Sequence, residues 1–201
     1  MGKMNLLKGK WDGKVGQTVG AKWKNRSTIR TYTAPSNPNT QAQQNVRGAF
    51  KSITSFVALF SDQSKYLSAL DTSGMSVRNA IVKLNKEMIA DNSFAKSDLL
   101  ISKGGLQKVT GEAAVATAGK VGITWTAPTA TNFTQEAQLV AVMVQESTGI
   151  VEVKTALATA ESLEGTLTFE AGKVDVYVYF LDKRGSNKVA SLSDYIEVTV
   201  A

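Results

Sequence analysis

Two prolines and a helix-start signal between residues 33 and 50 constrain the fold of this chain more than any other feature. Pro35 and Pro38 fix their own φ angles and push the residues before them into extended backbone, so no helix runs through this segment. Thr40 is a favourable N-cap residue, and Gln43 three residues later completes a capping box. The sequence therefore predicts a stiff, extended connector followed by a helix.

Apolar residues recur after the connector at the spacing of one helical face. They are Val46, Ala49, Phe50, Ile53, Phe56, Val57 and Phe60. This spacing predicts an amphipathic helix over about residues 41–61, and a similar pattern predicts a second helix over about 74–90. A short helical turn is expected between them, over residues 63–71.

The chain before the connector is basic and rich in glycine. Residues 1–51 hold ten lysines and arginines against one acid, Asp12, a net charge of +9, whereas the other 150 residues carry −3. Four glycines between residues 9 and 20 break any helical pattern, and the valines, isoleucine and aromatic residues favour short strands over 5–33. Such strands are marginal alone, so we expect this arm to pair with another surface.

The arm, the connector and the helix start supply the candidate interaction residues through positive charge, aromatic rings and a rigid turn. They are Lys14, Lys22, Trp23, Lys24, Arg26, Arg30, Tyr32, Pro35, Pro38, Thr40 and Arg47. The basic residues could neutralise phosphates while the rings stack on bases, which would make a nucleic-acid contact. The alternative, which we favour, is a solvated hairpin face or packing on an acidic protein neighbour.

From residue 113 onward, short apolar runs alternate with turn residues. Strands are expected at 121–125, 138–145, 150–156, 166–169, 174–181 and 196–200, and one more at 99–101. This pattern predicts an antiparallel β-sandwich with Trp125 in its core. Because the chain has no cysteine, the fibronectin type III variant fits better than the disulfide-bonded immunoglobulin one.

The expected fold class is therefore α+β and mostly β. It combines a basic, extended N-terminal β-arm, a small helical middle and a C-terminal antiparallel β-sandwich. The stretch 110–120, dominated by glycine, alanine and threonine, predicts a boundary between two domains, residues 1–110 and 111–201.

The composition excludes several kinds of active site. The chain has neither cysteine nor histidine, which removes thiol nucleophiles, Ser-His-Asp triads and the usual zinc sites. The glycines at 13, 16 and 20 lack the Gly-Lys-Ser/Thr ending of a phosphate loop. No apolar run approaches the length of about 18 residues that spans a membrane, and the N-terminus lacks the apolar core of a signal peptide. We expect no enzyme, no cofactor, no metal and no membrane partner.

Motifs at both ends of the chain resemble one protein family. Residues 13–50 contain G-K-V-G-x-x-V-G-x-x-W-K, then I-R-x-Y, then N-P-x-T-x-A-Q-x-x-x-R-x-x-F, and residues 175–195 resemble the same family's ending. The family comprises uncharacterised proteins of Bacteroidota and their phages. A similar N-P-x-T-x-x-Q-x-x-x-R arrangement occurs in small phage-encoded proteins.

The resemblance implies a structural protein of a bacteriophage virion. We expect an oligomeric ring or adaptor in the head–tail (portal or neck) region, assembled in the host cytoplasm. Its partners would be further copies of itself and other virion proteins, with a possible contact to nucleic acid. Two alternatives stay open: a cell-surface or carbohydrate adhesion module that uses the sandwich, and a nucleic-acid-binding protein that uses the basic arm.

Overall fold

The computed structural model of this chain describes residues 3–5, 10–23, 26–34, 36–67, 69–70, 72, 74–90, 94–130, 132–184 and 187–201. Two compact units divide the chain, residues 1–40 and residues 41–201. The first is a four-stranded antiparallel sheet in which each strand pairs with the next along the chain. Its strands are β1 (Lys3–Asn5), β2 (Lys10–Val15), β3 (Thr18–Trp23) and β4 (Arg26–Thr31).

The extended arm and connector agree with the sequence prediction. The backbone N–H of Tyr32 donates to the carbonyl of Gln17 at 2.7 Å, which continues the ladder just past β4. Residues 32–34 and 36–40 form neither helix nor strand, and their side chains are exposed. Helix α1 (Gln41–Phe60) then begins directly after Thr40, where the capping signal places it.

Shorter helical segments follow α1 and confirm a helical middle. They are η1 (Ser61–Gln63), α2 (Ser64–Leu67), α3 (Val77–Leu84), α4 (Lys86–Ala90) and η2 (Lys96–Asp98). None of the helices among the described residues is long and apolar enough to cross a membrane.

The helix expected over 74–90 is broken at Asn85. Its buried side-chain amide donates to the carbonyls of Ile81 and Leu100, and its Oδ1 accepts from the N–H of Leu100, each at 2.8 Å. These bonds hold the segment 99–101 against the end of α3, so this segment is irregular and buried rather than the expected strand. The hydroxyl of Ser193 accepts from the N–H of Ile101 at 3.0 Å and secures the other side.

Two antiparallel sheets form the C-terminal part. Their strands are β5 (Ala113–Thr117), β6 (Lys120–Thr124), β7 (Gln138–Gln145), β8 (Ile150–Leu157), β9 (Ser162–Glu164), β10 (Gly172–Arg184), β11 (Asn187–Ala190) and β12 (Asp194–Val200). One sheet has the order β5-β6-β9; the other has β11-β10-β7-β8, with β12 also paired to β10. These sheets of three and five strands resemble a fibronectin type III or immunoglobulin-like sandwich, so the α+β, mostly β prediction is confirmed.

The strand expected at 166–169 is displaced to 162–164. The carboxylate of Glu152 on β8 accepts hydrogen bonds from the N–H and hydroxyl of Thr166 and from the N–H of Leu167. The Glu152 side chain therefore accepts the hydrogen bonds that a neighbouring strand would otherwise accept from these backbone N–H groups. The strands β5 and β11 carry small or charged residues, and the sequence pattern did not indicate them.

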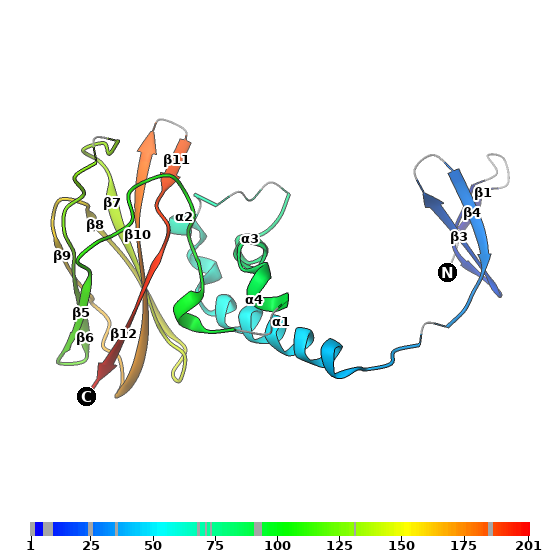
Figure 1. Ribbon diagram of the computed structural model, residues 1–201, viewed down its shortest axis with the longest axis horizontal. Helices are drawn as coiled ribbons and strands as arrows, with labels where there is room; N and C mark the ends of the chain where they lie inside the picture. Colours follow the sequence, from blue (N-terminus) through cyan, green and yellow to red (C-terminus); the bar gives the residue numbers. More distant parts are fainter. Residues whose placement is uncertain are drawn as a thin grey trace. The chain divides into compact units, whose positions relative to one another are not determined.

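The larger sheet is buried on both faces. Side chains of one face, such as Leu139 and Val176, pack on Val121, Ile123 and Trp125 in the sandwich core. Those of the other face pack on the helices in a second core. This core includes Ile53, Phe56, Val57, Phe60, Val140, Val142, Val144, Tyr177 and Tyr179. Figure 1 shows the resulting order of layers within this unit: helices, large sheet, small sheet.

The shared core bears directly on the domain boundary expected near residue 110. Because α1 packs on β7 and β10, the helical segment and the sandwich belong to one compact unit, residues 41–201. The chain divides after residue 40, and the expected boundary at 110 falls inside the second unit.

Candidate assembly site on the N-terminal sheet

Strand register separates the N-terminal sheet into two faces of different chemistry. Lys14 pairs with Val19, which pairs with Arg30, while Gly20 lies between Gly13 and Ile29. Directly paired residues point to the same side of a sheet, and successive residues alternate. One face therefore carries Lys14, Val19, Thr28 and Arg30. The opposite face carries Gly13, Val15, Thr18, Gly20, Ile29 and Thr31.

Among residues 13–21 and 28–32, the first face is basic and includes the ring of Tyr32. The ammonium of Lys14 lies 3.6 Å from the centroid of the Tyr32 ring, a cation–π contact. The Lys14 ammonium covers one side of the Tyr32 ring, although the residue as a whole keeps 41% exposure. Arg30 is exposed on the same face. This face offers positive charge, and only the other side of the ring is open to stacking.

Among residues 13–21 and 28–31, the second face carries no charged residue and has two exposed apolar side chains. Val15 is 41% exposed and Ile29 is 58% exposed. Among residues 13–21, 28–34 and 36–40, Gly20 alone is buried. Within these residues the unit has no apolar core, so the second face is free to pack on a partner. Val15 and Ile29 were not among the interaction residues predicted from the sequence, although β-branched residues in an arm without a covering layer were a signal for them.

The other predicted interaction residues are distributed along the chain. Lys22, Trp23 and Arg26 lie in β3 and β4, where Trp23 pairs with Arg26. Lys24 and Pro35 lie outside the described residues. Pro38 and Thr40 are exposed in the connector, and Arg47 is exposed on α1. Among the predicted residues whose side chains the structure describes, Lys14, Arg30 and Tyr32 lie together on one face of the sheet.

The first turns of α1 present a second apolar surface. Val46 is 43% exposed and Phe50, four residues later, is 49% exposed. The predicted apolar face of this helix is buried only from Ala49 onward, at Ala49, Ile53, Phe56, Val57 and Phe60. A shallow hollow of about 370 Å³ lies beside Val46 and is lined also by Ala42, Gln43 and Arg47. The helix therefore extends beyond the core that its second half helps to form.

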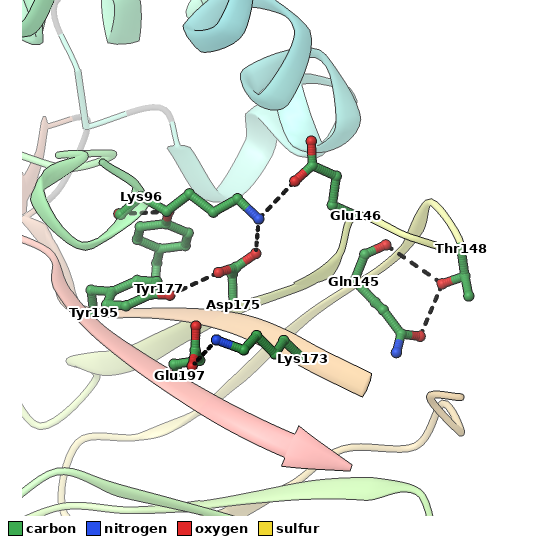
Figure 2. Close-up of polar contacts among 9 residues, drawn as sticks. All are labelled: Lys96, Gln145, Glu146, Thr148, Lys173, Asp175, Tyr177, Tyr195 and Glu197. Carbon is green, nitrogen blue, oxygen red and sulfur yellow. Dashed lines mark hydrogen bonds and ion pairs between the residues drawn. The ribbon is translucent and has the colours of Figure 1, made fainter. Parts of the chain in front are cut away.

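A cluster of polar side chains in the second unit links several of its elements (Figure 2). The Lys96 ammonium lies 2.7 Å from a carboxylate oxygen of Glu146 and 2.8 Å from one of Asp175. The Tyr195 hydroxyl donates to the other oxygen of Asp175 at 2.8 Å, and the Tyr177 hydroxyl donates to the Lys96 carbonyl at 2.9 Å. These contacts tie η2 to β10, β12 and the turn after β7.

The same cluster is poorly suited to nucleophilic chemistry. Burial acts to lower the pKa of Lys96, but its hydrogen bonds to Asp175 and Glu146 and their negative charges outweigh burial and raise it. Burial and the bond to Asp175 likewise raise the pKa of Tyr195. Both groups stay protonated at neutral pH, so neither supplies a base or an amine nucleophile. Within the described ranges no group of three or more acidic residues could hold a metal ion.

Comparison with solved structures finds a likeness to the crystal structure of the rat CD45 extracellular region, domains d3–d4. The TM-score is 0.37 and the sequence identity is 16%. The likeness covers 49% of this chain and 51% of that one, so the chain spans about half the length of the structure it matches. No curated protein matches the sequence.

A family comparison covers far more of the chain. The DUF6266 family, described as a family of unknown function, matches residues 9–196. This range includes β2 to β4, the connector, the helices and nearly all of the two C-terminal sheets. The motifs at both ends of the sequence lie within the matched range, and this protein is a member of the DUF6266 family.

Proposed function

We propose that this protein is a structural component of a bacteriophage virion that assembles through its N-terminal sheet. Its role would be that of an oligomeric ring or adaptor in the head–tail region, formed in the host cytoplasm. In this role the protein binds copies of itself and other virion proteins and catalyses no reaction. The virion setting rests on the resemblance to phage-encoded proteins, and the assembly mode rests on the sheet.

The observation that carries the assembly mode is a separate sheet whose described side chains form no apolar core. Residues 1–40 form their own compact unit, and their apolar side chains Val15 and Ile29 stay exposed. Ordering such a segment costs backbone entropy that its small internal burial offsets poorly. A partner surface that covers the Val15–Ile29 face would supply the missing apolar burial.

Charge favours an anionic partner for the same unit. Residues 1–40 hold eight basic residues and one acid, a net charge of +7, whereas residues 41–201 sum to −1. Long-range attraction of this kind steers association and weakens as salt screens it. An assembly that combines the apolar face with the basic face would therefore weaken, without vanishing, at high ionic strength.

Nucleic-acid binding is the second candidate, because the basic face carries Lys14, Arg30 and Tyr32 together. A nucleic-acid contact would depend on phosphate neutralisation, and its affinity would fall steeply with salt. The Lys14 ammonium already covers one side of the Tyr32 ring, which restricts base stacking to the other side. Protein assembly uses both faces of the sheet, whereas a phosphate contact uses only one.

Deletion of residues 1–33 tests the assembly mode. We expect the shortened protein to stay folded, because the second unit holds both apolar cores, and to lose the oligomer formed by the full chain. Size-exclusion chromatography with light scattering, at low and high salt, measures both masses. A shortened protein that assembles like the full chain would contradict the proposal.

The virion setting has a separate test. Mass spectrometry of purified particles from a phage that encodes this protein should detect it in stoichiometric amount with other head–tail proteins. A full chain that stays monomeric but shifts duplex DNA at low salt would support the nucleic-acid alternative instead.

A further inference from the structure

A hollow on the helical side of the second unit is lined by both apolar and basic side chains. It has a volume of about 610 Å³ and lies among α3, α4, the segment after α2 and the segment after η2. Leu70 and Leu84 contribute apolar lining, and both side chains are partly exposed. The volume lies in the range of pockets that hold small organic ligands.

Three lysines from separate segments line this hollow. Lys83 belongs to α3, Lys86 to α4, and Lys103 to the segment after η2. All three are exposed, and none has an ion-pair partner among the residues that the structure describes. Glu87 is the acidic residue among the described lining residues, whose formal charges sum to +2.

This juxtaposition selects one class of ligand. An anion without an apolar body would leave the two leucine side chains in contact with water, and a neutral apolar molecule would leave the lysines without counter-charge. A molecule with both parts removes apolar surface from water and meets the positive charges. The surrounding unit has a net charge of −1, so the positive potential is local to the hollow rather than general.

We propose that this hollow is a binding site for a small amphipathic organic anion, with an apolar body and a carboxylate, sulfonate or phosphate group. The body packs on Leu70 and Leu84, and the acidic group pairs with Lys83, Lys86 and Lys103. The site is independent of the assembly role assigned to the N-terminal sheet, since every lining residue belongs to residues 41–201.

The test uses two fluorescent probes that differ in their charge. Anilinonaphthalene sulfonate carries the acidic group, and phenylnaphthylamine has the same ring system without it. Titrations use the full chain, a triple variant Lys83→Gln, Lys86→Gln, Lys103→Gln, and a matched triple variant Lys120→Gln, Lys154→Gln, Lys183→Gln. A further variant, Ala69→Phe, fills the hollow and leaves its charges unchanged.

We expect saturable binding of the sulfonate, about tenfold weaker in the first triple variant and unchanged in the matched one. Ala69→Phe should abolish this binding, and thermal unfolding by circular dichroism should show the variants folded. Equal binding of both probes to the unmodified chain would overturn the proposal, because the charges would then play no part. Equal weakening in both triple variants, or unchanged binding in the first, would overturn it as well.

Discussion

Two adjacent glycines, Gly104 and Gly105, differ sharply in their surroundings. A Cβ atom added at Gly104 would collide with the backbone carbonyl of Ala190, whereas one added at Gly105 would meet no atom within 4 Å. The close approach at Gly104 is held by the hydrogen bond from the N–H of Leu106 to the same carbonyl, at 3.1 Å. At Gly104 the neighbouring backbone of Ala190 therefore leaves no room for any side chain, whereas Gly105 has room for one.

Substitution of these glycines tests the packing of the loop on β11. Gly104→Ala should destabilise the protein by about 1–3 kcal/mol, because the backbone of Ala190 cannot move away without breaking its pairing with β10. Gly105→Ala should change the stability by less than about 0.5 kcal/mol. Urea unfolding followed by circular dichroism measures both. Equal stability of the two variants would show that the loop does not pack on Ala190.

The burial of a single residue could be predicted from the sequence where the residue type strongly favours the protein core. Trp125 was expected in the sandwich core; it is 4% exposed, and its indole N–H donates to the carbonyl of Ala158 at 2.8 Å. Asn85 and Glu152 were not expected to be buried. Their partners lie about 15 residues away along the chain, and nothing in the local pattern of a polar residue indicates which distant backbone it will bind.

At the scale of elements, the sequence predicts the ends of the long strands to within a few residues. It did not predict that the larger sheet is buried on both faces. Residues 139–144 are apolar without interruption, and such a run is typical of a strand covered on both sides. A strand in a two-sheet sandwich, however, needs to be covered on one face only. The helices supply the second cover, and the amphipathic face of α1 is the matching signal.

Because the larger sheet is buried on both faces, we expect that the sandwich does not fold stably without the helices. In a fragment of residues 111–201, five large side chains of the second core lose their cover: Val140, Val142, Val144, Tyr177 and Tyr179. At about 1.5–3 kcal/mol for each buried side chain, the loss is on the order of 10 kcal/mol, comparable to the whole stability of a domain. The fragment should aggregate or stay partly unfolded, whereas residues 41–201 should fold.

Light scattering and thermal unfolding of the two fragments distinguish these outcomes. A monomeric 111–201 fragment that unfolds at the temperature of the 41–201 fragment would show that the helices add nothing to the sheet. That result would support the boundary near residue 110 that the composition of residues 110–120 predicts.

At the scale of the whole molecule, the chain divides according to charge as well as contacts. The first 40 residues carry +7 and the rest −1. The asymmetry and the proline connector were both readable from the sequence. The two faces of the sheet were not, because the assignment of Val15 and Ile29 to one side depends on a register that only the paired strands define.

A single pair of substitutions on β4 tests most directly whether the Val15–Ile29 face drives assembly. Ile29→Lys and Thr28→Lys add the same charge at neighbouring exposed positions, on opposite faces of the sheet. Light scattering across a concentration series gives the midpoint of assembly for each variant and for the unmodified chain. Ile29→Lys should raise this midpoint at least tenfold, on the order of the burial energy of one large apolar side chain. Thr28→Lys adds a charge to the basic face and should leave the midpoint unchanged or lower it. An unmodified chain that stays monomeric, or equal midpoints for the two variants, would contradict assembly through this face.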